Sequence, residues 1–316
     1  MSAVAGNTTT GSVAGLRWRM TGEGDTHAAG TCAGHMEVAG TGDYCGIAST
    51  PDGDGCWVVD RYGEVHTVGN ASFHGSIPAN GITLGAAIVG IATVSTNVGY
   101  WLYSAAGDVY SFGDVPSYGT LAEIGYDPTV PVVSMAAHPD ARAYCLLNAE
   151  GDVFTFGDMK NHGSPRDEGI ILAGRAAGIM LAVSIHKGST PAGYNMDPDT
   201  GFDTGFDAVE GYIIVDSEGE VYTFGSAWFH GSIPSDKMLH AAPIIAVMPY
   251  ESSSQDGYRM VGADGAVYCF DAPFYGAPVG VMDGSTIVAA TEDPVNRDGY
   301  YLLSNSGEIF YYDINT

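Results

Sequence analysis

The sequence predicts an all-β chain that folds as a single β-propeller of about seven four-stranded blades. Three observations lead to this prediction. The 316 residues include 45 glycines and 15 prolines, which favour turns, and 19 tyrosines and 11 phenylalanines, which favour strands. Long amphipathic helical patterns are hard to find in the sequence. A pattern of about 44 residues, the length of a propeller blade, recurs along nearly the whole chain.

One glycine marks each repeat of this pattern. The marker glycines are Gly24, Gly63, Gly107, Gly151, Gly219, Gly265 and Gly307, at spacings of 39, 44, 44, 68, 46 and 42 residues. In every unit a β-branched residue follows two positions later and a ring side chain follows three positions later. The marker glycine therefore predicts a tight hairpin turn that requires a positive φ.

Each unit is predicted to contain four short strands. The first is apolar, as in residues 89–92, and the second resembles Gly99-Tyr100-Trp101-Leu102. The third begins just after the marker glycine, and the fourth lies near an aromatic-Gly-Ser tail such as Phe73-His74-Gly75-Ser76. Because all units follow this order, residues 1–316 are predicted to form one propeller domain.

Ring side chains recur at two positions of the unit, where we expect them to fill the wedge between stacked blades. These structural positions are Trp18, Trp57 and Trp101, six residues before the marker, and Tyr110, Phe154, Tyr222, Tyr268 and Phe310, three residues after it. The first unit has no clear apolar first strand, and the last unit stops at Thr316, soon after its third strand. Residues 7–15 are therefore expected beside the C-terminal blade, where they would leave no open sheet edge.

The charge of the chain argues against two classes of partner. With 37 acidic and 11 basic residues, the formal net charge is −26, so nucleic acid and anionic membrane surfaces should repel the chain. The sequence contains no signal-like start and no stretch of about 18 apolar residues, so we expect no membrane insertion.

The five cysteines, Cys32, Cys45, Cys56, Cys145 and Cys269, lack C-x-x-C spacing and are expected to be mostly free thiols.

No catalytic motif is found in the sequence. It contains no G-x-S-x-G elbow, H-E-x-x-H pair or P-loop. His74 with Ser76, and His230 with Ser232, occupy one repeat position, which indicates an architectural role. We therefore expect a protein that is not an enzyme, with no catalytic residue and no cofactor.

Acidic residues follow six of the marker glycines and are interpreted as solvated hairpin residues, with a ring of cation sites as the alternative.

The 68-residue interval contains an insertion, at about residues 187–210, that we expect to contact a partner. Long loops on rigid scaffolds often carry function, and this one offers acidic and apolar side chains. The candidate partner-binding residues are Asp197, Asp199, Phe202, Asp203, Phe206 and Asp207. Calcium binding by Asp197, Asp199 and Asp203 is the alternative to an exposed acidic loop. Counting from Asp197, however, Ala208 stands where an EF-hand loop requires Glu.

The units resemble a repeat of actinobacterial and actinobacteriophage proteins, Gly-Tyr-Trp-Leu-Val, then a spacer, then Asp-Gly-x-Val-x-x-Phe-Gly and an aromatic-Gly-Ser tail. Gly99-Tyr100-Trp101-Leu102 with residues 107–113 matches it best, and Gly211-Tyr212 with residues 219–232 is a second close match. The resemblance covers nearly the whole chain and implies the propeller fold. Proteins with such repeats include secreted bacterial proteins and phage minor tail proteins.

This resemblance, together with the missing secretion signal and second region, favours a non-enzymatic structural or adhesive virion protein, a phage minor tail or tail-tip protein. Its expected partners are other tail proteins and a host cell-surface glycan. Two alternatives stay open. One is a bacterial extracellular or cell-surface propeller that binds carbohydrate, and the other is an enzyme that uses the central funnel of the propeller.

Overall fold

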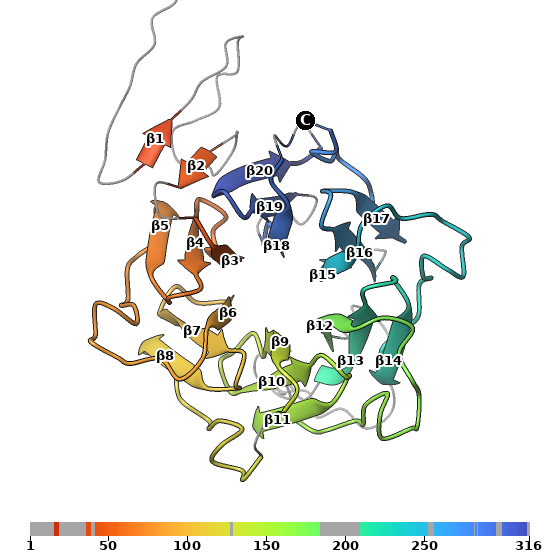
Figure 1. Ribbon diagram of the computed structural model, residues 1–316, viewed down its shortest axis with the longest axis horizontal. Coiled ribbons are helices and arrows are strands. Elements are labelled where there is room, and N and C mark those ends of the chain that lie inside the picture. The colour runs from red at the N-terminus through yellow and green to blue at the C-terminus, as the bar shows by residue number, and fades with distance from the viewer. Residues whose placement is uncertain are drawn as a thin grey trace, which may run out of the picture.

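The computed structural model describes residues 16–18, 36–38, 42–126, 129–183, 209–251, 256–280, 282, 284–294 and 299–314. These residues contain 20 β-strands and no helix, which confirms the all-β prediction. The strands form one five-stranded sheet and five three-stranded sheets, and within each sheet neighbouring strands run antiparallel. The six sheets are arranged radially around a centre, as a β-propeller requires (Figure 1).

Each sheet has an inner, a middle and an outer strand. The inner strands are β3 (Tyr44–Ser49), β6 (Ile88–Thr93), β9 (Val132–Ala137), β12 (Ala176–Val183), β15 (Ile244–Glu251) and β18 (Ile287–Glu292). The middle strands are β4 (Gly55–Asp60), β7 (Gly99–Ser104), β10 (Ala143–Asn148), β13 (Val209–Asp216), β16 (Asp256–Gly262) and β19 (Tyr300–Ser304). The outer strands are β5 (Val65–Gly69), β8 (Val109–Gly113), β11 (Val153–Gly157), β14 (Val221–Gly225), β17 (Val267–Phe270) and β20 (Glu308–Tyr312). Each inner strand contacts the inner strands of both neighbouring sheets, β18 with β3 included, so the ring of six sheets is closed.

The expectation of about seven blades is therefore wrong for the described part of the chain, which forms six sheets. Six of the seven marker glycines belong to these sheets, whereas Gly24 lies outside the described residues. The physical reason lies in the first unit, which has no apolar segment from which an inner strand could form. Its described strands, β1 (Leu16–Trp18) and β2 (Met36–Val38), extend the last sheet instead.

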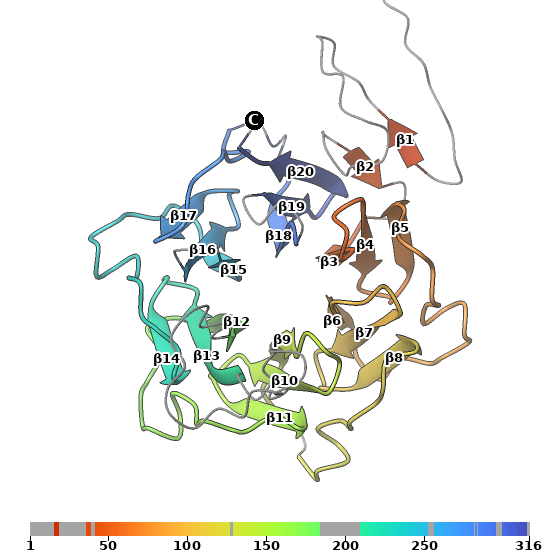
Figure 2. The same ribbon diagram turned by 180° about the vertical axis from the view of Figure 1, so that it is seen from behind.

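This extension covers the outer edge of the last sheet. β2 pairs with β20 through Met36 with Ile309 and Glu37 with Glu308, and β1 pairs with β2. Figure 2 shows both strands outside β20, at the edge farthest from the centre. Residues 7–15, expected at this place, lie outside the described residues. Two N-terminal strands thus cover an outer strand from the C-terminal end of the chain.

The predicted fourth strand of each unit is also wrong for five of the six sheets, which have three strands. The aromatic-Gly-Ser tail forms turns and irregular structure instead, because its backbone groups are satisfied outside a ladder. For example, the N–H of Ile77 donates to the Gly63 carbonyl at 3.0 Å, and that of Ile233 donates to the Gly219 carbonyl at 3.1 Å. The tail therefore packs on the hairpin turn of its own unit.

The hairpin turns at the described marker glycines have the expected backbone. All six have positive φ, between 76° at Gly63 and 92° at Gly307. A Cβ atom at Gly63 would lie 2.3 Å from Ile77 Cγ1, so the docked tail also requires glycine there.

The core lies between neighbouring sheets rather than at the centre of the ring. Trp57 and Trp101 have no exposed surface and pack against side chains of the following sheet. Of the other structural ring positions, Tyr110, Phe154, Tyr222, Tyr268 and Phe310 are half-buried, whereas the side chain of Trp18 is outside the described part. Face-to-face stacking of sheets thus accounts for the burial of the aromatic side chains.

Candidate functional site

A tyrosine hydroxyl joins each of five sheets to the sheet before it. The lock tyrosines are Tyr100, Tyr144, Tyr212, Tyr258 and Tyr300, each in a middle strand. Their hydroxyls donate to the carbonyls of Gly75, Gly119, Gly163, Gly231 and Gly276 in the preceding aromatic-Gly tails. At four of these junctions the hydroxyl also accepts a backbone N–H from the residue before that glycine, as from His74 at 3.3 Å. Burial raises the pKa of each lock tyrosine to about 12.

Sequence reasoning noted this tyrosine but gave it no role. The signal was present, because a tyrosine precedes the structural ring position in five units and an aromatic-Gly pair stands upstream of each. Gly75 and Gly231 have φ of 129° and 130°, a region that favours glycine. The ring is thus held together by a repeated hydrogen bond whose two halves lie in different sheets.

The acidic residues after the marker glycines make hydrogen bonds within their own units. Ser76 Oγ donates to Glu64 Oε2 at 3.3 Å, and Ser232 Oγ donates to Glu220 Oε2 at 3.2 Å. The turn itself is fixed by an oxygen three residues before the marker, as where Asp60 Oδ1 accepts two backbone N–H groups at 2.9 Å. Among the described residues no three His, Cys, Asp or Glu side chains form a group that could hold a metal ion.

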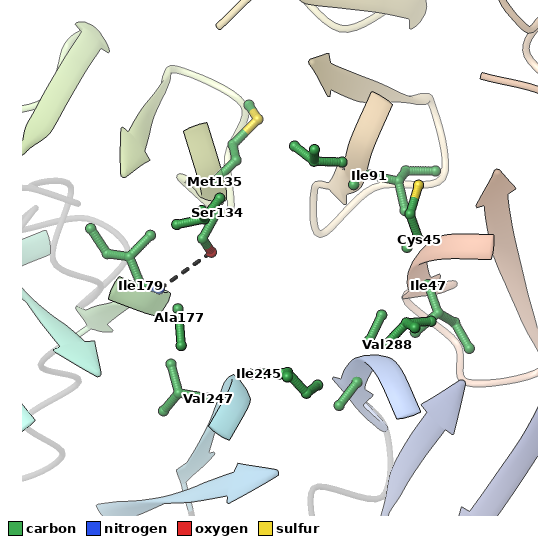
Figure 3. Close-up of a pocket in the computed structure, with 18 of the residues that line it drawn as sticks. Cys45, Ile47, Ile91, Ser134, Met135, Ala177, Ile179, Ile245, Val247 and Val288 are labelled. Atoms are coloured by element: carbon green, nitrogen blue, oxygen red, sulfur yellow. Dashed lines mark hydrogen bonds between the residues drawn. The ribbon is translucent and has the colours of Figure 1, made fainter. Parts of the chain in front are cut away.

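A narrow channel lies at the centre of the ring, with a volume of 160 Å³ (Figure 3). The inner strands line it, and all six carry a β-bulge or a similar break in register. The residues at these breaks include Cys45, Val89, Val133, Ala177, Ile245 and Val288, all of which line the channel. The next position holds a small residue in every sheet, and a Cβ at Gly46 would lie 2.9 Å from Gly90 Cα. Small residues therefore allow the inner strands to approach one another.

The channel offers little acid–base chemistry. Its lining residues include two ionisable side chains, those of Cys45 and Tyr103. Burial raises the pKa of the Cys45 thiol to about 12 and also raises the pKa of Tyr103. The thiol is thus held protonated and is a poor nucleophile at neutral pH. Cys45, Cys145 and Cys269 are free thiols, and Cys32 is outside the described residues.

A buried arginine occupies one of the repeat positions at which other units have a tryptophan. Arg259 stands where Trp57 and Trp101 stand in other sheets, and its Nε donates to the Pro273 carbonyl at 3.0 Å. The guanidinium carbon lies 4.8 Å from the ring centroid of Tyr250, 5.0 Å from that of Tyr300 and 5.6 Å from that of Tyr275. In the part of the chain that the structure describes, its Nη1 and Nη2 atoms have no hydrogen-bond partner. Arg259 thus donates to a backbone carbonyl, as the indole N–H groups of Trp57 and Trp101 do, but it also places a positive charge in the core.

A second pocket, of 260 Å³, lies between the β12–β13 and β15–β16 hairpins. The strands β12, β13 and β15 have eight residues and β16 has seven, whereas the other inner and middle strands have five or six. The two long hairpins thus form walls that the shorter strands of the other sheets do not provide. Trp228 lines the pocket although 71% of its surface is exposed.

The predicted partner-binding residues lie outside the described part of the chain. Asp197, Asp199, Phe202, Asp203, Phe206 and Asp207 belong to residues 184–208, so neither partner contact nor calcium binding is tested at these positions. This stretch connects β12 to β13, whose described ends border the second pocket. Sequence reasoning chose the insertion and missed the pocket beside it.

Comparison with known proteins indicates the fold and no more. No protein-family model and no curated protein matches the chain. A structural genomics protein of unknown function from Bacteroides thetaiotaomicron VPI-5482 has a similar crystal structure, with a TM-score of 0.51 and 12% identity over 90% of this chain and 72% of that chain. Because 1062 chains of solved structures match significantly, the fold alone does not point to one function. No helix in the described residues could span a membrane.

Proposed function

We propose that this protein is a non-enzymatic structural and adhesive component of a bacteriophage tail, a minor tail or tail-tip protein built as a propeller. In this role the ring is a rigid disc that docks on other tail proteins and presents loops to the host surface. Its expected location is the virion, and its expected partners are tail proteins and a host-surface glycan.

The observation that carries the proposal is the repeated tyrosine lock. Five buried hydroxyls join successive sheets, and the inner strands close the ring, so the scaffold resists deformation. A rigid scaffold with long hairpins on one side suits binding, because little conformational entropy is lost on contact. The neutral lining of the central channel favours this role over catalysis in the funnel.

A second candidate is a bacterial extracellular or cell-surface propeller that binds carbohydrate. The exposed Trp228 beside a pocket favours it, since aromatic rings with an accessible face are suited to stacking on ligands. Both candidates share a contact with surface glycans and differ in where the protein resides.

Fractionation of infected and uninfected cultures, followed by mass spectrometry of purified phage particles and of cell envelopes, tests the proposal. The chain is expected in purified particles at a fixed ratio to the known tail proteins. Its absence from particles together with its recovery from envelopes of uninfected cells would replace the phage role with the bacterial one.

A further inference from the structure

The lining of the second pocket includes a residue at the repeat position where a tryptophan is buried elsewhere in the ring. Trp57 and Trp101 are fully buried, and their indole N–H groups donate to the carbonyls of Ser72 at 2.7 Å and Pro116 at 2.8 Å. In β13 the corresponding residue is Ile213, which lines the pocket. An isoleucine side chain is smaller than an indole, so this position leaves volume between the sheets.

Neighbouring residues do not fill that volume. Between the β9–β11 sheet and the β12–β14 sheet, the corresponding residue is Cys145, whose side chain is smaller than that of isoleucine. There, however, Met159 packs against the hydrophobic cluster that contains Cys145. Eight residues after the marker glycine, where that unit has Met159, the next unit has Ala227. The following residue, Trp228, stands where other units have Ser72 and Pro116, and it extends into solvent rather than into the core. This unit therefore departs from the repeat pattern at two positions, Ile213 and Trp228, and both residues line the open pocket.

The β15–β16 wall brings polar groups to this pocket. Strand alternation places Pro249 and Glu251 on one face, and register places Tyr258 and Asp256 opposite them. This face turns toward Ile213 and Met180 of the preceding sheet. The pocket thus has an apolar floor, an exposed indole and two carboxylates at its outer end.

The chemistry of the lining defines a ligand class. The lining includes Ser226, His230, Glu251 and Asp256 but no Lys or Arg, and His230 Nδ1 lies 2.8 Å from Asp271 Oδ2. With a net charge of −26 on the chain, an anionic ligand is disfavoured. A volume of 260 Å³ lies just below the roughly 300–1,000 Å³ of pockets for drug-sized molecules, which suits a ligand as small as one sugar ring. A pyranose offers an apolar face for the indole and hydroxyl donors for the carboxylates.

We propose that the pocket between the β12–β13 and β15–β16 hairpins binds one pyranose ring that carries no acidic substituent. The inference rests on the adhesive function proposed above and assigns its glycan contact to a site. In the bound state the pyranose ring stacks on the indole of Trp228, and the sugar hydroxyls donate to the carboxylates of Glu251 and Asp256.

Ligand-observed NMR on the full chain tests this assignment with methyl glycosides of glucose, galactose, mannose and N-acetylglucosamine, and with glucuronic acid as the acidic probe. Two variants restore residues that the repeat uses elsewhere: Ile213→Trp fills the pocket, and Trp228→Ser removes the indole. Both should fold, because Trp57 and Ser72 occupy these positions in another sheet. Phe229→Ala is the matched control, since Phe229 is 54% exposed, adjacent to Trp228 and not part of the lining.

At least one neutral glycoside should bind, Trp228→Ser should weaken that binding about tenfold or more, and Ile213→Trp should abolish it. Phe229→Ala should leave the affinity unchanged. Failure of every neutral glycoside to bind, preference for glucuronic acid, or undiminished binding in both pocket variants would each overturn the assignment.

The outcomes also separate this inference from the proposed function. A chain found in virions that binds no sugar retains the tail role and loses the pocket assignment. A chain that binds sugar through Trp228 but is absent from virions retains the pocket and loses the tail role.

Discussion

Removal of one lock hydroxyl tests how the sheets are held together. In Tyr100→Phe the aromatic ring stays, and with it the contacts to the rings of Trp57 and Phe112, at centroid distances of 5.7 and 5.8 Å. The variant loses the 2.5 Å hydrogen bond to the Gly75 carbonyl and the 3.3 Å hydrogen bond from the His74 N–H. Tyr100 has no exposed surface, so water cannot readily replace these partners.

The expected loss follows from those two groups. An unsatisfied buried backbone group costs about 1–3 kcal/mol, and the carbonyl with the short hydrogen bond contributes most of this. We therefore expect Tyr100→Phe to lower the free energy of unfolding by about 2 kcal/mol. Guanidinium denaturation measures it as a lower midpoint at an unchanged slope.

Tyr62→Phe is the control, because 59% of Tyr62 is exposed and its change should stay within about 0.5 kcal/mol. Tyr258→Phe removes the lock at another junction, so its effect should add to that of Tyr100→Phe. A loss in Tyr100→Phe no greater than that in Tyr62→Phe would refute the locking role of the hydroxyl.

Four further predictions concern the core, the charge, the pH response and the insertion. Trp101→Ala should lower the free energy of unfolding by about 3–5 kcal/mol in the same denaturation assay, because the indole is fully buried; a loss below about 1 kcal/mol would contradict its core position. Arg259→Trp should raise the denaturation midpoint, since the buried Nη1 and Nη2 atoms have no hydrogen-bond partner among the described residues, whereas an indole N–H could replace the Nε donor to the Pro273 carbonyl without burying a charge; a lower midpoint would show that the cation is favourable there. The lock tyrosines have a pKa of about 12 in the folded state and about 10 in the unfolded state, so the stability that they confer is complete below pH 10 and is lost as the pH rises toward 12. Denaturation at a series of pH values should show the free energy of unfolding fall across this range, and a free energy that does not change with pH would refute the prediction. Deletion of residues 187–208, which ends just before β13, should leave the circular dichroism spectrum and unfolding midpoint nearly unchanged while it weakens partner contact in adsorption and assembly assays; unchanged adsorption and assembly would remove the insertion as a contact site.

Local features of this fold could be predicted from the sequence. The marker glycines identified the hairpin turns because a turn depends on a few neighbouring residues, and the positions of the ring side chains followed from their recurrence at fixed distances from these glycines. The number of sheets could not be read in the same way. It depends on whether the first unit supplies an inner strand, and β2 pairs with β20 instead.

The fourth strand and the pocket illustrate two other limits. The aromatic-Gly tail has strand-like residues, but Tyr100 of the next unit satisfies Gly75, and this partner lies 25 residues away. The pocket arises from a residue that is missing, since Ile213 stands where the pattern has tryptophan. A deviation from a repeat is visible in sequence, yet the volume that it leaves depends on the side chains packed around it.

Electron microscopy of purified phage particles that carry this chain shows whether the propeller is a component of the tail. The proposed function predicts density for a closed ring of six sheets at the tail, with the β12–β13 and β15–β16 hairpins directed away from the particle. Particles whose tail density is complete without such a ring would contradict it.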